Sequence, residues 1–390
     1  MTVTAEDRRI VWILGAGFSK PLGAPLLDDL FLPATWDLYA IQYGESRFSK
    51  LRSKTAEAVH WLYNHGRRFT LGRSISWNWT FDGEALWANA EEFLDYLDTA
   101  ATAPTAAALK ARIEQLAGKF LTLQHPGVSI SIPAVDELAA AARRLLAAEC
   151  SAFLSRIDLK SERCDPFVRW AQRVGPKDTV ITFNYDIFLD LLAMLPNCKF
   201  AVVDPATPEL EPDLAPALKL HGSVDWGFSN GVFKRTDNKE FSLICNDSAI
   251  GIASPGPKKL EATGSLKDLW DKAVQALQSA DAVVFLGYRF PPTDSHARHT
   301  LLTALAENGK PYLALHTVLG PDIGSPASAR LRELLRYAMR LKGRIHVPPR
   351  DYTHQEFSLV QHPLYTEDFL SLFERHWVTD REHVMSVAAR

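Results

Sequence analysis

Cysteine is scarce in this chain, and its positions exclude several kinds of site. The 390 residues include four cysteines, Cys150, Cys164, Cys198 and Cys245, and no two of them form a C-x-x-C pair. A zinc site built from paired cysteines is therefore not visible in the sequence, and we expect no structural metal. In a reducing compartment these cysteines are also expected to remain free of disulfides.

Long apolar runs and a strong net charge are also lacking. No run approaches the roughly 18 apolar residues of a membrane helix, and the start, MTVTAEDRRIVWIL, does not have the apolar core of a signal peptide. The formal net charge is −3, so no general positive field favours nucleic acid or an acidic membrane. We therefore expect a cytoplasmic protein that binds neither directly.

What the sequence does contain is a glycine turn after a short apolar run. Residues 11–14 are rich in strand formers and predict a buried parallel strand. Gly15 and Gly17 follow, and such a turn lets the backbone approach a phosphate. By itself G-x-G is a weak signal, because turns after strands commonly use glycine and Lys20 stands where the dinucleotide fingerprint has its third glycine.

Three later segments repeat the pattern of an apolar run that ends in small or polar residues. They are residues 180–190 (VITFNYDIFLD), 217–226 (ALKLHGSVDW) and 282–294 (AVVFLGYRFPPTD). Runs of this kind are typical of parallel strands whose carboxyl ends meet at one site. Asn184 carries an acceptor and two donors, and His221 can accept a proton near neutral pH. Asn184 and Asp186 could instead cap the next helix, and a single histidine is commonly structural.

The rest of the chain predicts an α/β fold. After Asp178, strand-like and helical patterns alternate, which is typical of a Rossmann-like parallel sheet with helices on both faces. Further strands are expected at residues 200–203, 312–316 and 344–347, with a hairpin across Ser229-Asn230-Gly231.

Residues 40–177 have a different pattern, because their apolar residues recur at helical spacing. Helices are expected at residues 50–63, 84–98, 106–123 and 135–157, with a tryptophan-bearing loop at residues 73–83. We therefore predict that residues 1–39 and 178–390 form the nucleotide-binding core. Residues 40–177 would then be a large helical layer or subdomain inserted after the first strand.

Four motifs in this order resemble the sirtuin family. They are Gly15-Ala16-Gly17-Phe18-Ser19, Thr182-Phe183-Asn184-Tyr185-Asp186, His221-Gly222-Ser223 and Gly287-Tyr288. The resemblance covers the nucleotide-binding core and is closest to the bacterial defence-associated branch. Asn89-Ala90-Glu91-Glu92-Phe93-Leu94, inside the expected insertion, is similar to a segment of that branch.

The resemblance implies that NAD is the substrate and that Asn184 and His221 are catalytic. Asn184 would hold the ribose or a water, and His221 would accept a proton. The residues implied to bind NAD are Gly15, Ala16, Gly17, Phe18, Ser19, Asp186, Gly287, Tyr288 and Asp294. Asp294 and His296 match the late motif and could instead cap a helix. Arg289 stands where many relatives have serine, and it could meet a phosphate or face solvent.

Three functions remain open from the sequence. Deacylating sirtuins usually carry two C-x-x-C pairs after their H-G motif, whereas Ser223-Val224-Asp225-Trp226 follows here. The resemblance therefore favours an NAD glycohydrolase that depletes NAD in antiviral defence. The alternatives are a protein deacylase or ADP-ribosyltransferase, and a non-catalytic sensor of NAD or ADP-ribose. The same branch implies a homo-oligomer, and a separate activating protein such as a motor ATPase.

Overall fold

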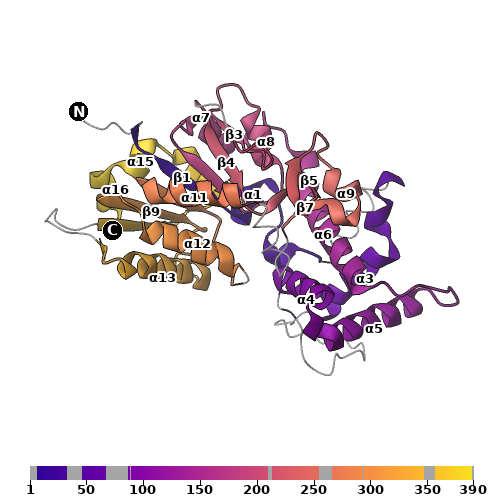
Figure 1. Ribbon diagram of the computed structural model, residues 1–390. Coiled ribbons are helices and arrows are strands. Elements are labelled where there is room, and N and C mark those ends of the chain that lie inside the picture. The colour runs from indigo at the N-terminus through magenta and orange to yellow at the C-terminus, as the bar shows by residue number, and fades with distance from the viewer. Residues whose placement is uncertain are drawn as a thin grey trace. The chain divides into compact units, whose positions relative to one another are not determined.

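The structure is a computed structural model in which the chain packs into two compact units (Figure 1). It describes residues 7–32, 46–66, 87, 89–209, 213–253, 266–292, 294–346 and 356–388. Unit 1 comprises residues 1–24, 154–220 and 266–390, and unit 2 comprises residues 25–153 and 221–265. Within the described ranges, no helix combines the length and apolar character needed to cross a membrane.

Unit 1 is built on an eight-stranded sheet whose recorded strand pairs are all parallel. In spatial order the strands are β10 (Ile345–His346), β11 (Glu356–His362), β9 (Tyr312–Val318), β8 (Ala282–Leu286), β1 (Ile10–Leu14), β2 (Thr179–Thr182), β4 (Ala215–Lys219) and β3 (Phe200–Val202). The first strand of the chain therefore lies in the middle of the sheet. After β1 the chain moves to one side, and after β8 it moves to the other, so the order of strands reverses between β1 and β8.

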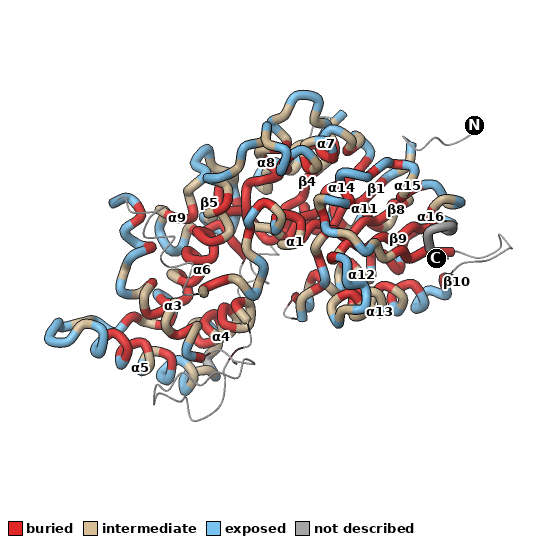
Figure 2. Tube along the Cα trace, turned by 180° about the vertical axis from the view of Figure 1, so that it is seen from behind, coloured by how far each residue is buried: buried red, intermediate tan, exposed pale blue. Residues whose placement is uncertain are grey.

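Helices cover both faces of this sheet. All five residues of β1 and all five of β8 are buried, as expected for strands that are covered on both sides (Figure 2). On one face, the Trp12 ring contacts Trp170 of α7 at 5.6 Å and Phe373 at 4.9 Å between ring centroids. α11, α12 and α13 form the layer on the other face (Figure 1). The α-helices of unit 1 are α1 (Ala16–Ser19), α7 (Asp165–Arg173), α8 (Phe188–Ala193), α11 (Lys267–Ser279), α12 (Ser295–Ala306), α13 (Pro326–Leu341), α14 (Thr366–Leu372), α15 (Arg375–Thr379) and α16 (Arg381–Ala388).

Unit 2 contains the four longer helices that follow β1, and a small sheet. The helices are α3 (Lys54–Gly66), α4 (Ala90–Thr102), α5 (Ala107–Gln124) and α6 (Val135–Ala152), with α9 (Phe241–Ile244) beside the sheet. The central helix is α6, which packs against α3, α4 and α5. Asn89 caps α4, because its side chain accepts a hydrogen bond from the Glu92 N–H at 3.0 Å.

The sheet of unit 2 is antiparallel, with the order β6 (Val232–Arg235), β5 (Gly222–Ser229), β7 (Ile250–Ile252). β5 and β6 form a hairpin whose two turn residues, Asn230 and Gly231, have φ angles of 53° and 77°. Such angles are typical of a type I′ turn, which asparagine and glycine favour.

The described chain also contains short 3-10 turns: η2 (Lys20–Leu22), η3 (Leu27–Asp29), η4 (Ser46–Arg52), η5 (Pro104–Ala106), η6 (Phe153–Arg156) and η7 (Asp247–Ala249).

The predicted α/β fold with a parallel sheet is confirmed, as is a helical segment after the first strand. The strand expected at residues 344–347 is β10, and one more strand, β11, follows it in the chain. The predicted division at residues 39 and 178 stays a prediction about domains, and the packing groups the chain differently. Residues 154–177 pack with unit 1, since α7 covers Trp12, and residues 221–253 belong to unit 2. The tryptophan-bearing loop at residues 73–83 lies outside the described residues.

Candidate functional site

The glycine turn after β1 contacts the glycine turn after β8. Gly15 N–H donates to the Leu286 carbonyl at 3.0 Å, and Gly17 N–H donates to the Gly287 carbonyl at 3.3 Å. A Cβ added to Gly17 would lie 2.6 Å from the Gly287 Cα, and one added to Gly287 would lie 2.3 Å from the Gly17 Cα. Gly287 also has a φ of +64°, which disfavours other residues. The packing of these two loops therefore requires both glycines, independently of any ligand.

Three polar residues of the predicted site form a hydrogen-bonded chain. Asn184, in the loop after β2, donates from Nδ2 to the Ser19 Oγ at 3.2 Å. The Ser19 Oγ in turn donates to the Asp186 Oδ2 at 3.3 Å, and the Asp186 Oδ1 accepts from the Phe188 N–H at 2.8 Å. Ser19 and Asp186 are buried, whereas Asn184 is half-buried. Asn184 is therefore the member of the chain that a ligand could reach.

A buried ion pair lies close to this chain, and sequence reasoning missed it. Lys219, at the end of β4, is 0% exposed, and its Nζ lies 2.9 Å from the Asp190 Oδ2. Burial raises the pKa of Asp186, while the charge of Lys219 acts in the opposite direction. Two buried carboxylates thus face one ammonium group. The signal in the sequence was a lysine inside the apolar run ALKL, where a buried strand rarely carries a charge unless it is paired.

The two aromatic residues of the predicted site are parts of the core. The Phe18 ring packs at 5.2 Å from both the Phe167 and the Trp170 rings. The Tyr288 ring stacks on Phe183, with 4.2 Å between ring centroids. Both side chains are buried, so a ligand would meet the backbone of these residues.

Asp294 caps a helix, which was the alternative to a binding role in the sequence analysis. Its Oδ1 accepts from the Ala297 N–H at 3.3 Å at the beginning of α12, and its Oδ2 accepts from the Tyr288 hydroxyl at 3.5 Å. The His296 ring lies 4.7 Å from the Trp270 ring. Arg289 is exposed. Asp294 therefore holds the loop after β8 in place against α12.

His221 belongs to unit 2, where it directly precedes β5. It is buried, and its carbonyl accepts from the Ala253 N–H at 2.9 Å. The next residue, Gly222, has a φ of +78°, and a Cβ there would lie 2.2 Å from the Gly251 carbonyl oxygen. The glycine of the H-G motif is therefore required by the close approach of β5 and β7. The structure brings together Ser19, Asn184 and Asp186 within unit 1.

No protein-family model matches the chain. None of the curated proteins matches it either. What the site does must therefore follow from its own residues.

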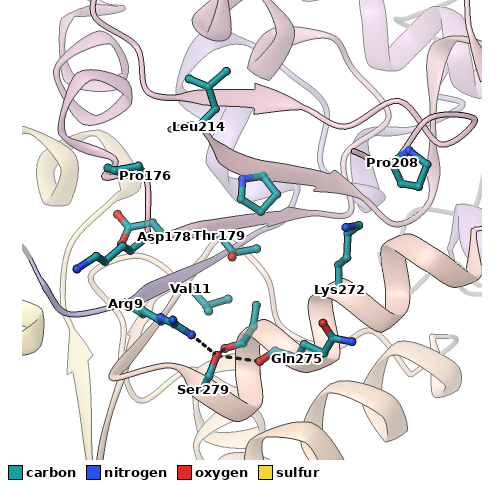
Figure 3. A pocket seen from close by; sticks show the side chains of 13 residues that line it. Arg9, Val11, Pro176, Asp178, Thr179, Pro208, Leu214, Lys272, Gln275 and Ser279 are labelled. Carbon is teal, nitrogen blue, oxygen red and sulfur yellow. Dashed lines mark hydrogen bonds between the residues drawn. The ribbon is translucent and has the colours of Figure 1, made fainter. Parts of the chain in front are cut away.

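A cavity of about 520 Å³ lies at the other end of the sheet, where the parallel strands begin (Figure 3). Its lining comes from the starts of β1, β2 and β4 and from the second half of α11. The lining residues are Arg9, Val11, Pro176, Lys177, Asp178, Thr179, Pro208, Leu214, Pro216, Lys272, Gln275, Ala276 and Ser279. None of the predicted site residues is among them, because those residues follow the carboxyl ends of the strands.

The cysteines are free, and within the described parts of the chain no cluster of three or more metal-ligating side chains occurs. Burial raises the pKa of the Cys198 and Cys245 thiols. A raised pKa keeps a thiol protonated, and a protonated thiol is a poor metal ligand. That the protein holds no metal stays a prediction.

Proposed function

We propose that this chain is a sirtuin-like NAD+ glycohydrolase, which cleaves the bond between nicotinamide and ribose. The observation that carries the proposal is the hydrogen-bonded chain Asn184–Ser19–Asp186, which joins polar residues from the loops after β1 and β2. In open parallel sheets, ligands bind at the carboxyl edge where the strand order reverses. Here that point lies between β1 and β8, beside the loop after β1.

The proposed reaction uses one water and releases nicotinamide and ADP-ribose. The C–N bond breaks, nicotinamide leaves with the bonding electron pair, and positive charge develops on the ribose. A water oxygen then bonds to the ribose carbon, and its proton goes to His221, the proposed general base. The Asn184 Oδ1 would accept a hydrogen bond from a ribose hydroxyl or from this water. A buried carboxylate such as Asp186 favours the developing positive charge.

The remaining predicted residues would hold the dinucleotide. Ala16 and Gly17 are half-buried, which leaves the loop after β1 accessible to the pyrophosphate. The N–H groups of Gly15 and Gly17 already donate to the loop after β8, so they support the loop. The backbone of Gly287 and Tyr288 would lie against the adenosine half. Asp294 would act indirectly, by holding Tyr288.

The proposed biological role follows from the resemblance to the defence-associated branch. Depletion of NAD+ by a homo-oligomer would stop the metabolism of an infected bacterial cell. A separate activating protein, such as a motor ATPase, would switch the enzyme on during infection.

NAD+ consumption, measured with and without an acetylated peptide, separates the three functions. We expect the purified protein, alone or with its activator, to consume NAD+ without peptide and to release free ADP-ribose. Consumption that requires the peptide would instead establish a deacylase, and modification of a protein target would establish a transferase. NAD+ binding without consumption, with any activator, would establish a sensor.

The variants Asn184→Ala and His221→Ala test the proposed catalytic roles of these two residues. His221→Ala should lower the rate of NAD+ hydrolysis about 10²–10⁴-fold, because the proton acceptor is lost. Asn184→Ala should lower it about 10²–10³-fold through loss of an orienting hydrogen bond. Neither residue holds the pyrophosphate, so NAD+ affinity, measured by calorimetry, should change little.

The matched control is His299→Ala, which removes an exposed histidine of α12. All variants must be measured under conditions in which the wild type is active. Hydrolysis at the wild-type rate by both site variants would rule out this assignment of the site.

A further inference from the structure

Three arginines gather at the carboxyl edge of the sheet in unit 1. Arg289 lies in the loop after β8, Arg298 near the beginning of α12 and Arg330 near the beginning of α13. β8 and β9 are neighbouring parallel strands, so the loops that leave them lie at the same edge. α12 and α13 follow these strands and pack against each other. The fold therefore brings together three guanidinium groups that are up to 41 residues apart in sequence.

The charges of the other two arginines act on Arg330. The pKa of Arg330 is lowered, first by burial and then by repulsion from Arg298 and Arg289. Within the described part of the chain, Arg289 and Arg330 form no hydrogen bond or ion pair, and Arg298 donates to the Pro292 carbonyl at 3.4 Å. On the same helix, Arg332 and Arg336 do pair, with Glu333 at 3.2 and 3.4 Å. Arg340 of the same helix also forms no ion pair with a described residue, so what distinguishes the three arginines is their place at one edge of the sheet.

The two helices increase the positive potential at this edge. α12 and α13 have 12 and 16 residues, and neither has an acidic residue in its first turn. Carboxylates are usually favourable there, because the amino end of a helix carries a partial positive charge. The one carboxylate at the beginning of α12, Asp294, is 2% exposed and already accepts from Ala297 and Tyr288. A fold that keeps like charges together without partners is destabilised unless an anion joins them.

We propose that Arg289, Arg298 and Arg330 bind a phosphate group of the dinucleotide, namely the phosphate monoester that distinguishes NADP+ from NAD+. This inference rests on the proposed function, in which the Gly287-Tyr288 loop lies against the adenosine half of the ligand. Arg289 is the next residue of that loop. The planar guanidinium group matches a phosphate with two parallel hydrogen bonds, and an arginine commonly accommodates the adenosine-ribose phosphate of NADP+.

Calorimetry with NAD+, NADP+ and inorganic phosphate tests the site without any need for turnover. The wild type should bind NADP+ at least tenfold more tightly than NAD+. Arg289→Ser and Arg330→Gln should each reduce NADP+ affinity about tenfold more than NAD+ affinity, because each removes one charge-assisted contact with the additional phosphate. The matched control is Arg340→Gln, in the last turn of the same helix α13, which should leave both affinities unchanged.

Thermal unfolding provides a second readout that a merely structural arginine would not give. Without ligand, Arg289→Ser and Arg330→Gln should unfold at the wild-type temperature or above it, because each substitution relieves repulsion. Arg340→Gln should lower the unfolding temperature slightly, since a cation is favourable at the end of a helix. NADP+ should then raise the unfolding temperature of the wild type more than that of either cluster variant.

The outcomes separate this inference from the proposed function. Equal affinity of the wild type for NAD+ and NADP+, or unchanged NADP+ affinity in both cluster variants, would overturn the inference, while NAD+ hydrolysis could still stand. Binding of inorganic phosphate without either dinucleotide would overturn the assignment to NADP+. Preferential NADP+ binding that falls in both variants, with no NAD+ hydrolysis, would support the inference and remove the proposed glycohydrolase.

Discussion

At the scale of single residues, the hydrogen-bond donors around Ser19 decide which end of the Asn184 side chain faces a ligand. Ser19 has one hydroxyl proton, and an ionised Asp186 attracts it. The Ser19 Oγ can then only accept from Asn184, which must use its Nδ2. This leaves the Asn184 Oδ1 as the atom presented to the ligand. The orientation of Asn184 thus depends on the charge of Asp186, which Lys219 helps to maintain.

Lys219→Met tests the buried charges on which this orientation depends. Loss of the ammonium group removes the cation that pairs with the buried Asp190 carboxylate, so the free energy of unfolding should fall by about 3–5 kcal/mol. Adding Asp190→Leu should recover part of this loss, because it removes one of the two buried carboxylates that face the ammonium group in the wild type. Urea denaturation of the two variants measures both effects.

The control is Lys267→Met, which breaks an ion pair with Asp271 that is exposed to solvent. Pairs of this kind add little to stability, so the midpoint of urea unfolding should remain close to that of the wild type. A Lys219→Met protein as stable as the wild type would contradict the paired, buried state of Lys219.

The glycines illustrate what the sequence could and could not predict at this scale. Their place after the ends of strands follows from the apolar runs that precede them. The structural need for glycine at these positions could not be predicted. Gly17 and Gly287 are 270 residues apart in the chain, and their contact depends on the order of the strands in the sheet. A phosphate loop and a tight contact between two loops have the same local pattern. Substitutions at Gly17 would therefore disturb the loop contact as well as any ligand.

At the scale of elements, a pair of histidines connects β9, β11 and α15. The His316 Nε2 lies 3.2 Å from the Val378 carbonyl, which can only accept, so this nitrogen carries the proton. In a neutral ring the His316 Nδ1 must then accept, and the His362 Nε2 donates to it at 3.0 Å. Burial and the charge of His362 hold the pKa of His316 well below its usual range, and burial lowers the pKa of His362 to about 4.

This pair predicts a loss of stability in weak acid. A histidine with a folded-state pKa of about 4 and an unfolded value of 6.5 binds fewer protons when folded throughout that window. The free energy of unfolding should therefore be highest above pH 6.5 and fall as the pH drops toward 4, by on the order of 3 kcal/mol for His362. Unfolding temperatures measured by circular dichroism between pH 7.5 and pH 4.5 give the slope.

His362→Gln should flatten that slope, because glutamine can still donate to His316 but does not titrate. His299→Gln, at an exposed position of α12, should keep the wild-type slope. Equal slopes for the wild type and His362→Gln would show that protonation of His362 does not cause the loss of stability in acid.

The helices after β1 were predicted more closely than the strands of unit 2. Amphipathic periodicity shows in any window of a helix that packs on one side, so α3 to α6 were expected close to their observed bounds. β7 has three residues and is defined by its pairing with β5 across an irregular register. Neither so short a strand nor its irregular pairing with β5 can be recognised from the local sequence. The hairpin of β5 and β6 was predicted, because Asn230-Gly231 is a local turn signal.

At the scale of the whole molecule, residues distant in sequence make up the sites. Ser19 and Asn184 come from the ends of two strands, and parallel strand ends were enough to predict that they meet. The arginine cluster was not predicted, because Arg298 and Arg330 lie within helices and carry no motif. Only the order of β8 and β9 in the sheet brings them together.

The predicted homo-oligomer is expected to form largely through residues 40–177. Leu123 is 57% exposed at the end of α5, and Val128 and Ile132, in the segment that follows, are 55% and 57% exposed. Apolar side chains that are exposed close together commonly mark an interface. Light scattering at micromolar concentration should therefore give a mass at least twice the 43.5 kDa of the chain.

Leu123→Glu combined with Ile132→Glu should shift that mass toward the monomer, because charges would have to be buried in the interface. The matched control is Met194→Glu, at an apolar position in unit 1 that is 76% exposed, and it should leave the mass unchanged. A wild type that stays at 43.5 kDa throughout the micromolar range would contradict assembly of the chain by itself. If Met194→Glu alone produced monomers, the interface would have to be sought in unit 1.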